Sequence, residues 1–495
     1  MINFNNVVFY YGSSKEASDK KIKNVSFDIG SGECILLCGR SGAGKSTILK
    51  LITGLAPQFY QGILEGTVLI LNKAPDLMTA KEKAETFGVV FQDPRSQFFM
   101  QKVHDEIAFS AENIGIASDL ILNNIQNISK LLQLESLLDK NVDELSSGQK
   151  QRIAIAAAFI LKPKILILDE PISNLDKNGI NTVVRMLKDI KKQGTTVIIS
   201  EHRIFEFATL ADKIFHISDG VLENVWLPEE FIKMDCFKLS EYGFRHPDMV
   251  TNRCKRNKRL NRDLLLKNLC YHYRDTHFGI ENINIEISKG DIVALVGGNG
   301  AGKTTLCKLL CGLISEKNGS IIWDGKVLKA SQRRKISYFV MQDADYQLYS
   351  DSVLSELYVS SGLSSKRNTQ KIECIMKLLH IFAYKEKHPW ALSGGQKQRV
   401  TIAAAMASNK SILIFDEPTS GLDYENMKAV SKAINILSRQ GTVNFVISHD
   451  LEFLSRVATR AVFIANGTIG ESISLKNNRD FRTVKDFLLR NGVAK

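Results

Sequence analysis

Two stretches of the sequence carry glycines, a lysine and a hydroxyl residue at a spacing typical of phosphate binding. They are GRSGAGKST at 39–47 and GGNGAGKTT at 297–305. Each follows a short apolar run and precedes a helical pattern, so backbone N–H groups and the positive end of a helix would face the oxyanions. We expect Lys45 and Lys303 to reach the β- and γ-phosphates of a nucleotide, and Ser46 and Thr304 to hold Mg²⁺. The candidate nucleotide ligands in these loops are Gly39, Arg40, Ser41, Gly42, Ala43, Gly44, Lys45, Ser46, Thr47, Gly297, Gly298, Asn299, Gly300, Ala301, Gly302, Lys303, Thr304 and Thr305.

Paired carboxylates end a second apolar run in each half of the chain, in ILILDEP at 165–171 and ILIFDEP at 412–418. Asp169 and Asp416 suit a Mg²⁺ ligand, directly or through water, as phosphoryl transfer requires. Glu170 and Glu417 then stand where a carboxylate polarises the attacking water. Capping of the following helix is an alternative for either pair alone, but it does not explain why both pairs recur with the two lysines.

These motifs belong to one internal repeat, which indicates two copies of one domain. SEH at 200–202 also recurs, as ISH at 447–449, and the order of the motifs is the same in both halves. Residues 226–262 match neither copy, and their end, TNRCKRNKRLNR, is polar and basic as linkers often are. We therefore divide the chain into a first domain (1–225), a linker (226–262) and a second domain (263–495).

Short β-branched runs indicate the elements that must position these motifs. CILLCG, ILILDE and TTVIIS in the first half, and IVALVG, ILIFDE and VNFVIS in the second, predict buried parallel strands with helices between them. The phosphate loops and the carboxylate pairs fall at the carboxyl ends of these strands, where open α/β sheets bind ligands. Each half is predicted to be an α/β domain.

Composition favours a globular protein of a reducing compartment. The chain is 44% hydrophobic and 24% charged, and its eight cysteines show no metal-binding spacing, so we expect free thiols. The amino terminus lacks the layout of a signal peptide, and the apolar runs are too short to cross a bilayer, so we expect a cytoplasmic protein. A net charge of +12 permits attraction to nucleic acid or to an acidic membrane, although a solvated basic surface is the more ordinary interpretation.

LSSGQKQR at 145–152 and LSGGQKQR at 392–399 resemble the signature of the ATP-binding-cassette (ABC) family. The resemblance covers nearly the whole chain apart from the linker. It implies two ABC-type P-loop NTPase domains, each with a mostly parallel core sheet, an antiparallel β subdomain and a helical signature subdomain. It also implies ATP and Mg²⁺ as cofactors, ATP hydrolysis, and a head-to-tail pairing in which each phosphate loop faces the signature of the other half. The signature residues expected at the nucleotide are Ser146, Gly148, Ser393 and Gly395.

The same resemblance assigns roles to two further pairs of residues. Gln92 and Gln342 match the glutamines that sense Mg²⁺ and the partner protein, and we count both among the expected catalytic residues and the expected Mg²⁺ ligands. His202 and His449 match the switch histidines near the γ-phosphate. A lone histidine after a strand is more often structural, but the matching position in both halves favours the functional role.

Four more residues match the family's pattern with less specificity. Asp176 and Asp423 match the loop that crosses the interface between paired domains. Tyr11 and Tyr273 match the aromatic residue that stacks on adenine. An ordinary core tyrosine is an equal alternative for each of the two tyrosines.

A second repeat begins at each glutamine, QDPRSQFFMQKVHDEI at 92–107 and QDADYQLYSDSVLSEL at 342–357. It resembles the extra helix of energy-coupling-factor (ECF) importers, which take up vitamins and transition metals. GLAPQFYQG at 54–62 is likewise similar to fused two-cassette ATPases of that group. The implied partners are a transmembrane coupling subunit and a substrate-binding membrane subunit, with this chain peripheral at the cytoplasmic face of the membrane. Phe98, Phe99, Leu348 and Tyr349 would contact a membrane subunit's helix, and packing in the core is the alternative.

Other tandem classes fit less well. Translation-associated cassette proteins carry a long charged linker and a Glu where this chain has Gln149 and Gln396, and sugar importers usually have a degraded second phosphate loop. A soluble nucleic-acid- or ribosome-associated ATPase stays open as the alternative, although nucleic acid is not the expected partner. Its phosphate contacts would be the basic linker residues Arg253, Lys255, Arg256, Lys258, Arg259 and Arg262.

One position distinguishes the two signatures, because Ser147 stands where the second half has Gly394. Glycine permits close backbone approach to phosphate, so a serine at this position would loosen the fit. The affected site is that of the second half, which borrows the first signature. We therefore expect the first half's site to carry more of the turnover.

Overall fold

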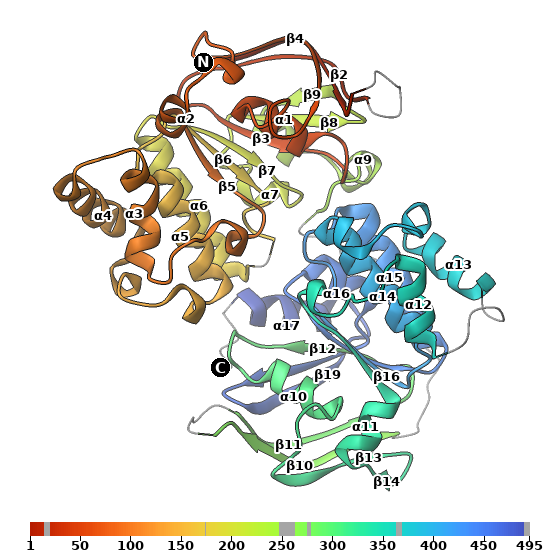
Figure 1. Cartoon of the computed structure of the whole chain (residues 1–495). Coiled ribbons are helices and arrows are strands. Elements are labelled where there is room, and N and C mark those ends of the chain that lie inside the picture. Colours follow the sequence, from red (N-terminus) through yellow and green to blue (C-terminus); the bar gives the residue numbers. More distant parts are fainter. Residues whose placement is uncertain (14–19, 174, 247–262, 275–278, 363–368, 490–495) are drawn as a thin grey trace. The chain divides into compact units, whose positions relative to one another are not determined.

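The computed structural model describes the chain except for residues 14–19, 174, 247–262, 275–278, 363–368 and 490–495. It divides into two compact units, Met1–His246 and Pro247–Lys495 (Figure 1). Each unit contains one copy of the repeated motifs, and each has the same two-sheet α/β architecture.

The central sheet of the first unit has the strand order β5-β6-β7-β3-β8-β9. All neighbouring strands are parallel except β8 and β9, which form an antiparallel edge. The near-continuous apolar runs fit this position, because both faces of a parallel sheet are covered. The strands are β3 (Cys34–Cys38), β5 (Phe87–Val90), β6 (Ile165–Asp169), β7 (Thr196–Ser200), β8 (Lys213–Ser218) and β9 (Val221–Trp226).

Alternate residues of this sheet enter two different cores. Ile35 and Leu37 face a core shared with an antiparallel sheet of order β2-β1-β4, and Leu36 faces a core shared with helices. The period of two along each strand therefore places a layer on either face. The antiparallel strands are β1 (Ile2–Tyr11), β2 (Lys20–Ile29) and β4 (Gly62–Ile70).

Helices α3, α4 and α5 pack on one another and form the helical subdomain of the first unit, which Figure 1 shows apart from the antiparallel sheet. Its apolar side belongs to the core that also contains Leu36. The helices of the first unit are α1 (Lys45–Thr53), α2 (Ala80–Thr86), α3 (Val103–Asn113), α4 (Ser118–Leu132), α5 (Ser147–Phe159), α6 (Lys177–Lys192), α7 (Ile204–Phe207), α8 (Pro228–Ile232) and α9 (Cys236–Tyr242).

The second unit repeats the plan, with a central sheet β15-β16-β17-β12-β18-β19 and an antiparallel sheet β11-β10-β13-β14. Its strands are β10 (Leu264–His272), β11 (Gly279–Ile287), β12 (Ile292–Val296), β13 (Asn318–Trp323), β14 (Lys326–Val327), β15 (Ser337–Val340), β16 (Ile412–Asp416), β17 (Val443–Ile447), β18 (Arg460–Ala465) and β19 (Thr468–Ser474). Its helices are α10 (Lys303–Leu310), α11 (Ala330–Ile336), α12 (Val353–Ser361), α13 (Thr369–Leu378), α14 (Gly394–Ala407), α15 (Tyr424–Arg439), α16 (Leu451–Val457) and α17 (Asn478–Leu489). The two predicted α/β domains with mostly parallel sheets are confirmed.

The first part of the predicted linker is folded. Residues 226–246 complete β9 and form α8 and α9, and Phe231, Leu239 and Phe244 are buried in the helix-side core of the first unit. These apolar residues stabilise a folded segment, although the second copy has no matching sequence. The remaining linker residues, 247–262, lie outside the described residues and include all six basic positions proposed as a nucleic-acid patch.

None of the helices in the described part of the chain is long and apolar enough to span a membrane. The cysteines follow the prediction where they are described: Cys34, Cys38, Cys307 and Cys311 are free and buried. Cys254 lies outside the described residues.

Candidate active site

The first phosphate loop joins β3 to α1 and requires glycine at its start. Gly39 has a φ of 145°, and a Cβ atom there would lie 2.0 Å from the carbonyl oxygen of Ile217. The Lys45 ammonium donates to the carbonyl oxygens of Gly39 (2.9 Å) and Arg40 (3.1 Å), so it spans the loop. The loop therefore has the shape of a phosphate cradle, with its lysine 5% exposed.

The second loop joins β12 to α10 and has the same construction. Lys303 donates to the carbonyl oxygens of Gly297 and Gly298, both at 2.8 Å. A Cβ atom at Gly297 would lie 2.3 Å from the carbonyl oxygen of Ile464. Both loops thus lie between a strand end and a helix start, and binding of phosphate by their N–H groups stays a prediction.

A hydroxyl group and a buried carboxylate meet beside each loop. Burial and then the charge of Glu170 raise the pKa of Asp169, while hydrogen bonds with Ser200 and Ser46 oppose the shift. A divalent cation fits this oxygen donor set, since it would stabilise the ionised carboxylate and use the ligands that Mg²⁺ prefers.

The second unit has the same pair, with the Thr304 hydroxyl 3.5 Å from Asp416. Burial, followed by the charge of Glu417, raises the pKa of Asp416 to about 7. Mg²⁺ at this position would offset the accumulated negative charge. The predicted metal ligands Ser46, Asp169, Thr304 and Asp416 are therefore brought together in pairs, and their role as ligands stays a prediction.

The carboxylate of Glu170 lies between two of the predicted site residues. It accepts a hydrogen bond from Gln92 Nε2 at 2.7 Å, and its Oε1 lies 3.2 Å from Nε2 of His202. Glu170 follows β6 with a φ of 47°, and its N–H donates to Ser200. A positive φ at a non-glycine residue costs about 1 kcal/mol or more, and such strain is found where a side chain must be aimed.

The carboxylate of Glu417 has different partners in the second unit. It accepts from the Ser448 hydroxyl and from the backbone N–H of His449, both at 3.2 Å, and lies 3.7 Å from the His449 ring. Its φ is also 47°. The predicted catalytic glutamate and the predicted switch histidine are therefore adjacent in both units. Gln92 and Gln342 are both exposed.

Glu201 is a buried carboxylate that sequence reasoning missed, and it stands where the second unit has Ser448. Its Oε1 accepts from the backbone N–H groups of His202 (2.7 Å) and Arg203 (3.1 Å). Burial, followed by the charge of Glu170, raises the pKa of Glu201. The SEH triplet of the first half could have signalled this, because a glutamate directly after a buried strand needs partners.

Tyr11 reaches the start of α1. Its hydroxyl lies 3.1 Å from that of Thr47, and its ring contacts Phe9 edge-on. Burial raises the pKa of Tyr11. Tyr273 contacts Tyr271 in the same edge-on manner. Stacking of either ring on adenine stays a prediction.

The signature motifs begin α5 and α14. The Gln149 side chain accepts from the N–H of Ser146 at 2.9 Å, and Gln396 accepts from Ser393 at 3.0 Å. Each glutamine thus caps the helix whose positive end would face a phosphate. The glycines Gly148 and Gly395 lie in the first turns.

The second signature does not support the expectation that Ser147 loosens the fit around phosphate and makes the two ATP sites unequal. Gly394, the counterpart of Ser147, has no positive φ, and a Cβ atom there would meet nothing within 4 Å. A serine is therefore accommodated without strain inside the unit.

We accordingly expect Ser147→Gly to change ATP turnover by no more than about twofold, because surface substitutions without such strain cost within ±0.5 kcal/mol. Steady-state ATPase assays of the parent and variant chains test this. A larger change would restore the serine as a cause of asymmetry.

The second repeat at the glutamines positions a short exposed loop. Glu106, buried in α3, accepts from the N–H groups of Phe99 and Met100, both at 2.8 Å. Glu356, buried in α12, accepts from Tyr349 and Ser350 at 3.1 and 3.0 Å. The recurring glutamate of the repeat therefore fixes the loop backbone.

The four predicted apolar contacts of this loop divide into two groups. Phe99 and Tyr349 are 73% and 80% exposed. Leu348 is only 2% exposed, and Phe98 packs against the helix-side core. Packing in the core, the stated alternative, therefore holds for Leu348, whereas Phe98 is only partly buried and its contact with a partner stays a prediction.

Comparison with known proteins decides the family. A family model described as ABC transporter matches residues 22–173 and 280–420. A Treponema denticola protein with the provisional name ABC transporter ATP-binding protein is 34% identical over 485 residues, covering 97% of this chain and 98% of its own. This chain belongs to the ABC transporter family. A second protein of that organism and name is 36% identical, over 95% and 96% of the two chains.

The two units are ABC ATPase domains, which hydrolyse ATP and use Mg²⁺ with it. Similar solved structures include ribosome-bound archaeal Pelota and ABCE1, with TM-score 0.72, 23% identity and coverage of 98% of this chain and 80% of that chain. An RNase-L inhibitor has TM-score 0.61, 23% identity and coverage of 97% and 93%. At these identities the likeness shows the tandem fold alone.

Proposed function

We propose that this ABC ATPase energises an importer of the ECF type, moving a vitamin, a vitamin precursor or a transition metal through separate membrane subunits. The partners would be a transmembrane coupling subunit and a substrate-binding membrane subunit. The chain would act at the cytoplasmic face of the membrane as a peripheral protein.

The observation that carries this proposal is the pair of exposed aromatic residues, Phe99 and Tyr349, on backbone fixed by buried glutamates. An exposed aromatic side chain on a rigid loop suits a hydrophobic contact with a partner's helix. Each loop begins at the glutamine of its own ATP site, and Gln92 contacts Glu170 at 2.7 Å. Binding of a partner at the loop would therefore change the position of the catalytic carboxylate.

For catalysis we propose that the two ABC domains pair head to tail within the chain. Lys45 would then share one ATP with Ser393 and Gly395, and Lys303 the other with Ser146 and Gly148. Glu170 and Glu417 would polarise the attacking water, and His202 and His449 would orient the γ-phosphate. Mg²⁺ would neutralise charge on the transferring phosphoryl group.

Replacing Phe99 and Tyr349 by Asp should weaken recruitment to the membrane partner while leaving ATP affinity unchanged. Burying an unpaired carboxylate in an apolar contact costs several kcal/mol, which is a loss of at least about a hundredfold in affinity. The measurements are co-purification with a multispanning membrane protein and nucleotide affinity of the purified chain.

Val327→Asp is the matched control, because Val327 is 63% exposed on β14, at the edge of the antiparallel sheet of the second unit. Equal loss of recruitment in the control, or loss of ATP affinity in the loop variants, would contradict the proposed docking role. Salt-dependent RNA binding without membrane recruitment would instead favour the nucleic-acid- or ribosome-associated alternative.

A further inference from the structure

The residues on either side of the switch histidine differ between the two units. The first unit has Glu-His-Arg at 201–203, and the second has Ser-His-Asp at 448–450. Each triplet comes directly after a buried strand of the central sheet, β7 in the first unit and β17 in the second. The acidic residue therefore precedes the histidine in the first unit and follows it in the second, so it reaches different backbone groups.

In the second unit the predicted catalytic carboxylate itself binds the backbone of the histidine. Glu417 accepts from the N–H of His449 and from the hydroxyl of Ser448, both at 3.2 Å. The same serine hydroxyl accepts from the N–H of Asp450 at 3.1 Å. Two N–H groups of the triplet thus bind to Glu417 and to a serine.

In the first unit one carboxylate accepts from both of the corresponding N–H groups. Glu201 Oε1 accepts from the N–H of His202 at 2.7 Å and from that of Arg203 at 3.1 Å. The histidine N–H, which binds the catalytic glutamate in the second unit, therefore binds a separate glutamate in the first.

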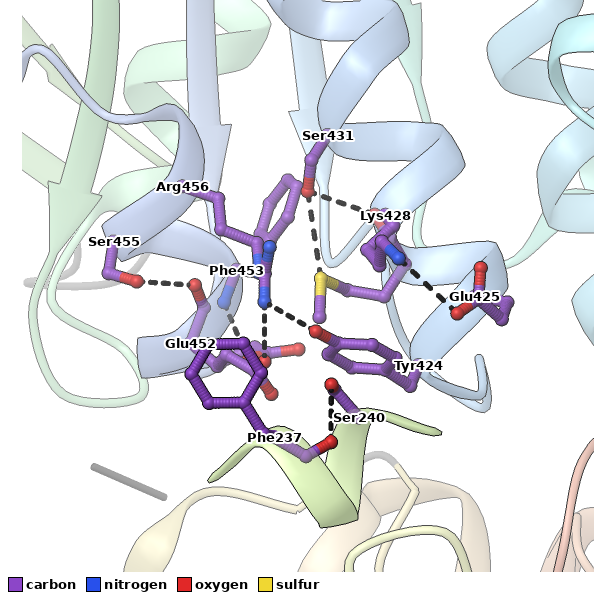
Figure 2. Close-up of polar contacts among 12 residues, drawn as sticks. Phe237, Ser240, Tyr424, Glu425, Lys428, Ser431, Glu452, Phe453, Ser455 and Arg456 are labelled. Carbon is purple, nitrogen blue, oxygen red and sulfur yellow. Dashed lines mark hydrogen bonds and ion pairs between the residues drawn. The ribbon is translucent and has the colours of Figure 1, made fainter. Parts of the chain in front are cut away.

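The second unit stabilises the segment after its histidine from within that segment. Asp450 caps α16 by accepting from the N–H of Phe453 at 3.0 Å. Glu452 pairs with Arg456 one turn further along the helix, at 3.0 Å (Figure 2). These contacts fix the start of α16 without a carboxylate before the histidine.

The corresponding helix of the first unit, α7, is only four residues long. Its N-cap residue is Arg203, and in the described structure this side chain makes no capping hydrogen bond. Glu201, which binds the N–H of that same residue, therefore supplies the acceptor that the N-cap side chain does not.

Glu201 has a cost that a serine at this position would avoid. The residue is 3% exposed, and its Oε2 is buried with no hydrogen-bond partner among the described residues. Burying a carboxylate oxygen without a partner is unfavourable, and such a group in a folded protein needs an explanation. The first unit retains this group beside its ATP site, where the second unit uses Ser448.

The exchange of acceptors changes what holds the catalytic carboxylate. Glu170 lies against two side chains, the Gln92 amide at 2.7 Å and the His202 ring at 3.2 Å. Gln92 is exposed, so its amide can follow the carboxylate when the carboxylate turns. The backbone N–H that binds Glu417 comes directly after β17 and cannot follow in the same way. Because hydrogen bonds to charged groups are among the stronger ones, breaking this bond slows a step in which the carboxylate turns to water.

We propose that Glu201 is a positioning residue of the first ATP site, which keeps the His202 N–H away from Glu170 and leaves this carboxylate able to turn toward the attacking water. The first site then hydrolyses ATP faster than the second. The inference rests on the proposed roles of Glu170 and Glu417 in catalysis.

The test measures ATP turnover of the full chain with Glu417→Gln, in which only the first site hydrolyses ATP. Glu201→Ser introduces the residue of the second unit, and we expect Glu170 then to accept the His202 N–H as Glu417 accepts that of His449. The kcat should fall by about tenfold, the effect of one hydrogen bond to a charged group, while KM for ATP changes by less than about twofold. A purely structural role would instead lower ATP affinity and thermal stability together with kcat.

Two further variants serve as controls in the same background. Glu201→Gln keeps an acceptor oxygen and should retain kcat within about threefold of the parent. Glu33→Ser is the matched control, because Glu33 also accepts a backbone N–H, from Gly30 at 2.8 Å, but precedes β3 at the end opposite the phosphate loop. Its kcat should equal that of the parent. A loss in either control as large as that in Glu201→Ser would overturn the positioning role.

The outcomes distinguish this inference from the proposed catalytic roles. Turnover that survives Glu170→Gln and Glu417→Gln together would overturn the roles of both carboxylates, and this inference with them. If that double variant is inactive, parent-like kcat in Glu201→Ser, or a rise in KM as large as the fall in kcat, would overturn the positioning role of Glu201 alone.

Discussion

Replacing Glu170 and Glu417 together by glutamine should abolish steady-state ATP hydrolysis and leave ATP binding intact. Both carboxylates follow a buried strand with a φ of 47° and lie next to a histidine. A glutamine keeps the shape of the side chain but cannot act as the base that polarises water. Such a base contributes roughly 10² to 10⁴ in rate, so the double variant should trap ATP.

Phosphate-release assays and equilibrium binding of a fluorescent ATP analogue measure the two properties. The single variants Glu170→Gln and Glu417→Gln show how turnover divides between the sites, and their unequal surroundings, Gln92 and Glu201 against Ser448, give a structural basis for any imbalance. Parent-like turnover in the double variant would refute the assignment of both carboxylates.

Gly39→Ala and Gly297→Ala should each weaken ATP binding at one site by about tenfold to a hundredfold. The added Cβ would meet a backbone carbonyl oxygen at 2.0 Å or 2.3 Å, so the phosphate loop must shift. Overpacking of this kind costs about 1–3 kcal/mol, and 1.4 kcal/mol corresponds to a factor of ten in affinity.

The matched control is Gly470→Ala on β19, where an added Cβ meets nothing within 4 Å and φ is not positive. Its ATP affinity should equal that of the parent. Each loop variant is measured with the lysine of the other loop replaced by alanine, so that a single site is observed. Unchanged affinity in Gly297→Ala would show that the loop does not hold phosphate in this geometry.

The motifs that occur in both halves of the chain could be predicted from the sequence. The phosphate loops, the carboxylate pairs and the signatures each combine a strand or helix boundary with fixed side-chain types, so each can be found once in either half. The two α/β domains follow from the apolar runs beside these motifs. The Glu170 carboxylate and the His202 ring are close because they follow β6 and β7, which are parallel neighbours and end at the same edge of the sheet.

Residues that act through burial could not be predicted in the same way. Glu106 and Glu356 appear in the sequence as ordinary charged residues, and only the tertiary structure shows that each accepts backbone N–H groups away from water. The sequence predicts Leu348, together with Tyr349, as a contact of a membrane subunit's helix, but Leu348 is 2% exposed. A pattern of two adjacent apolar residues does not state which of them faces the core.

The glutamate-held loops have a consequence for the timing of any encounter. Because Glu106 and Glu356 already fix two backbone N–H groups each, the displayed Phe99 and Tyr349 need not become ordered when a partner arrives. Since the loops need not fold on binding, differences in affinity for a partner should come mainly from the dissociation rate. The lifetime of a complex would then depend on how tightly the partner packs around the two aromatic rings.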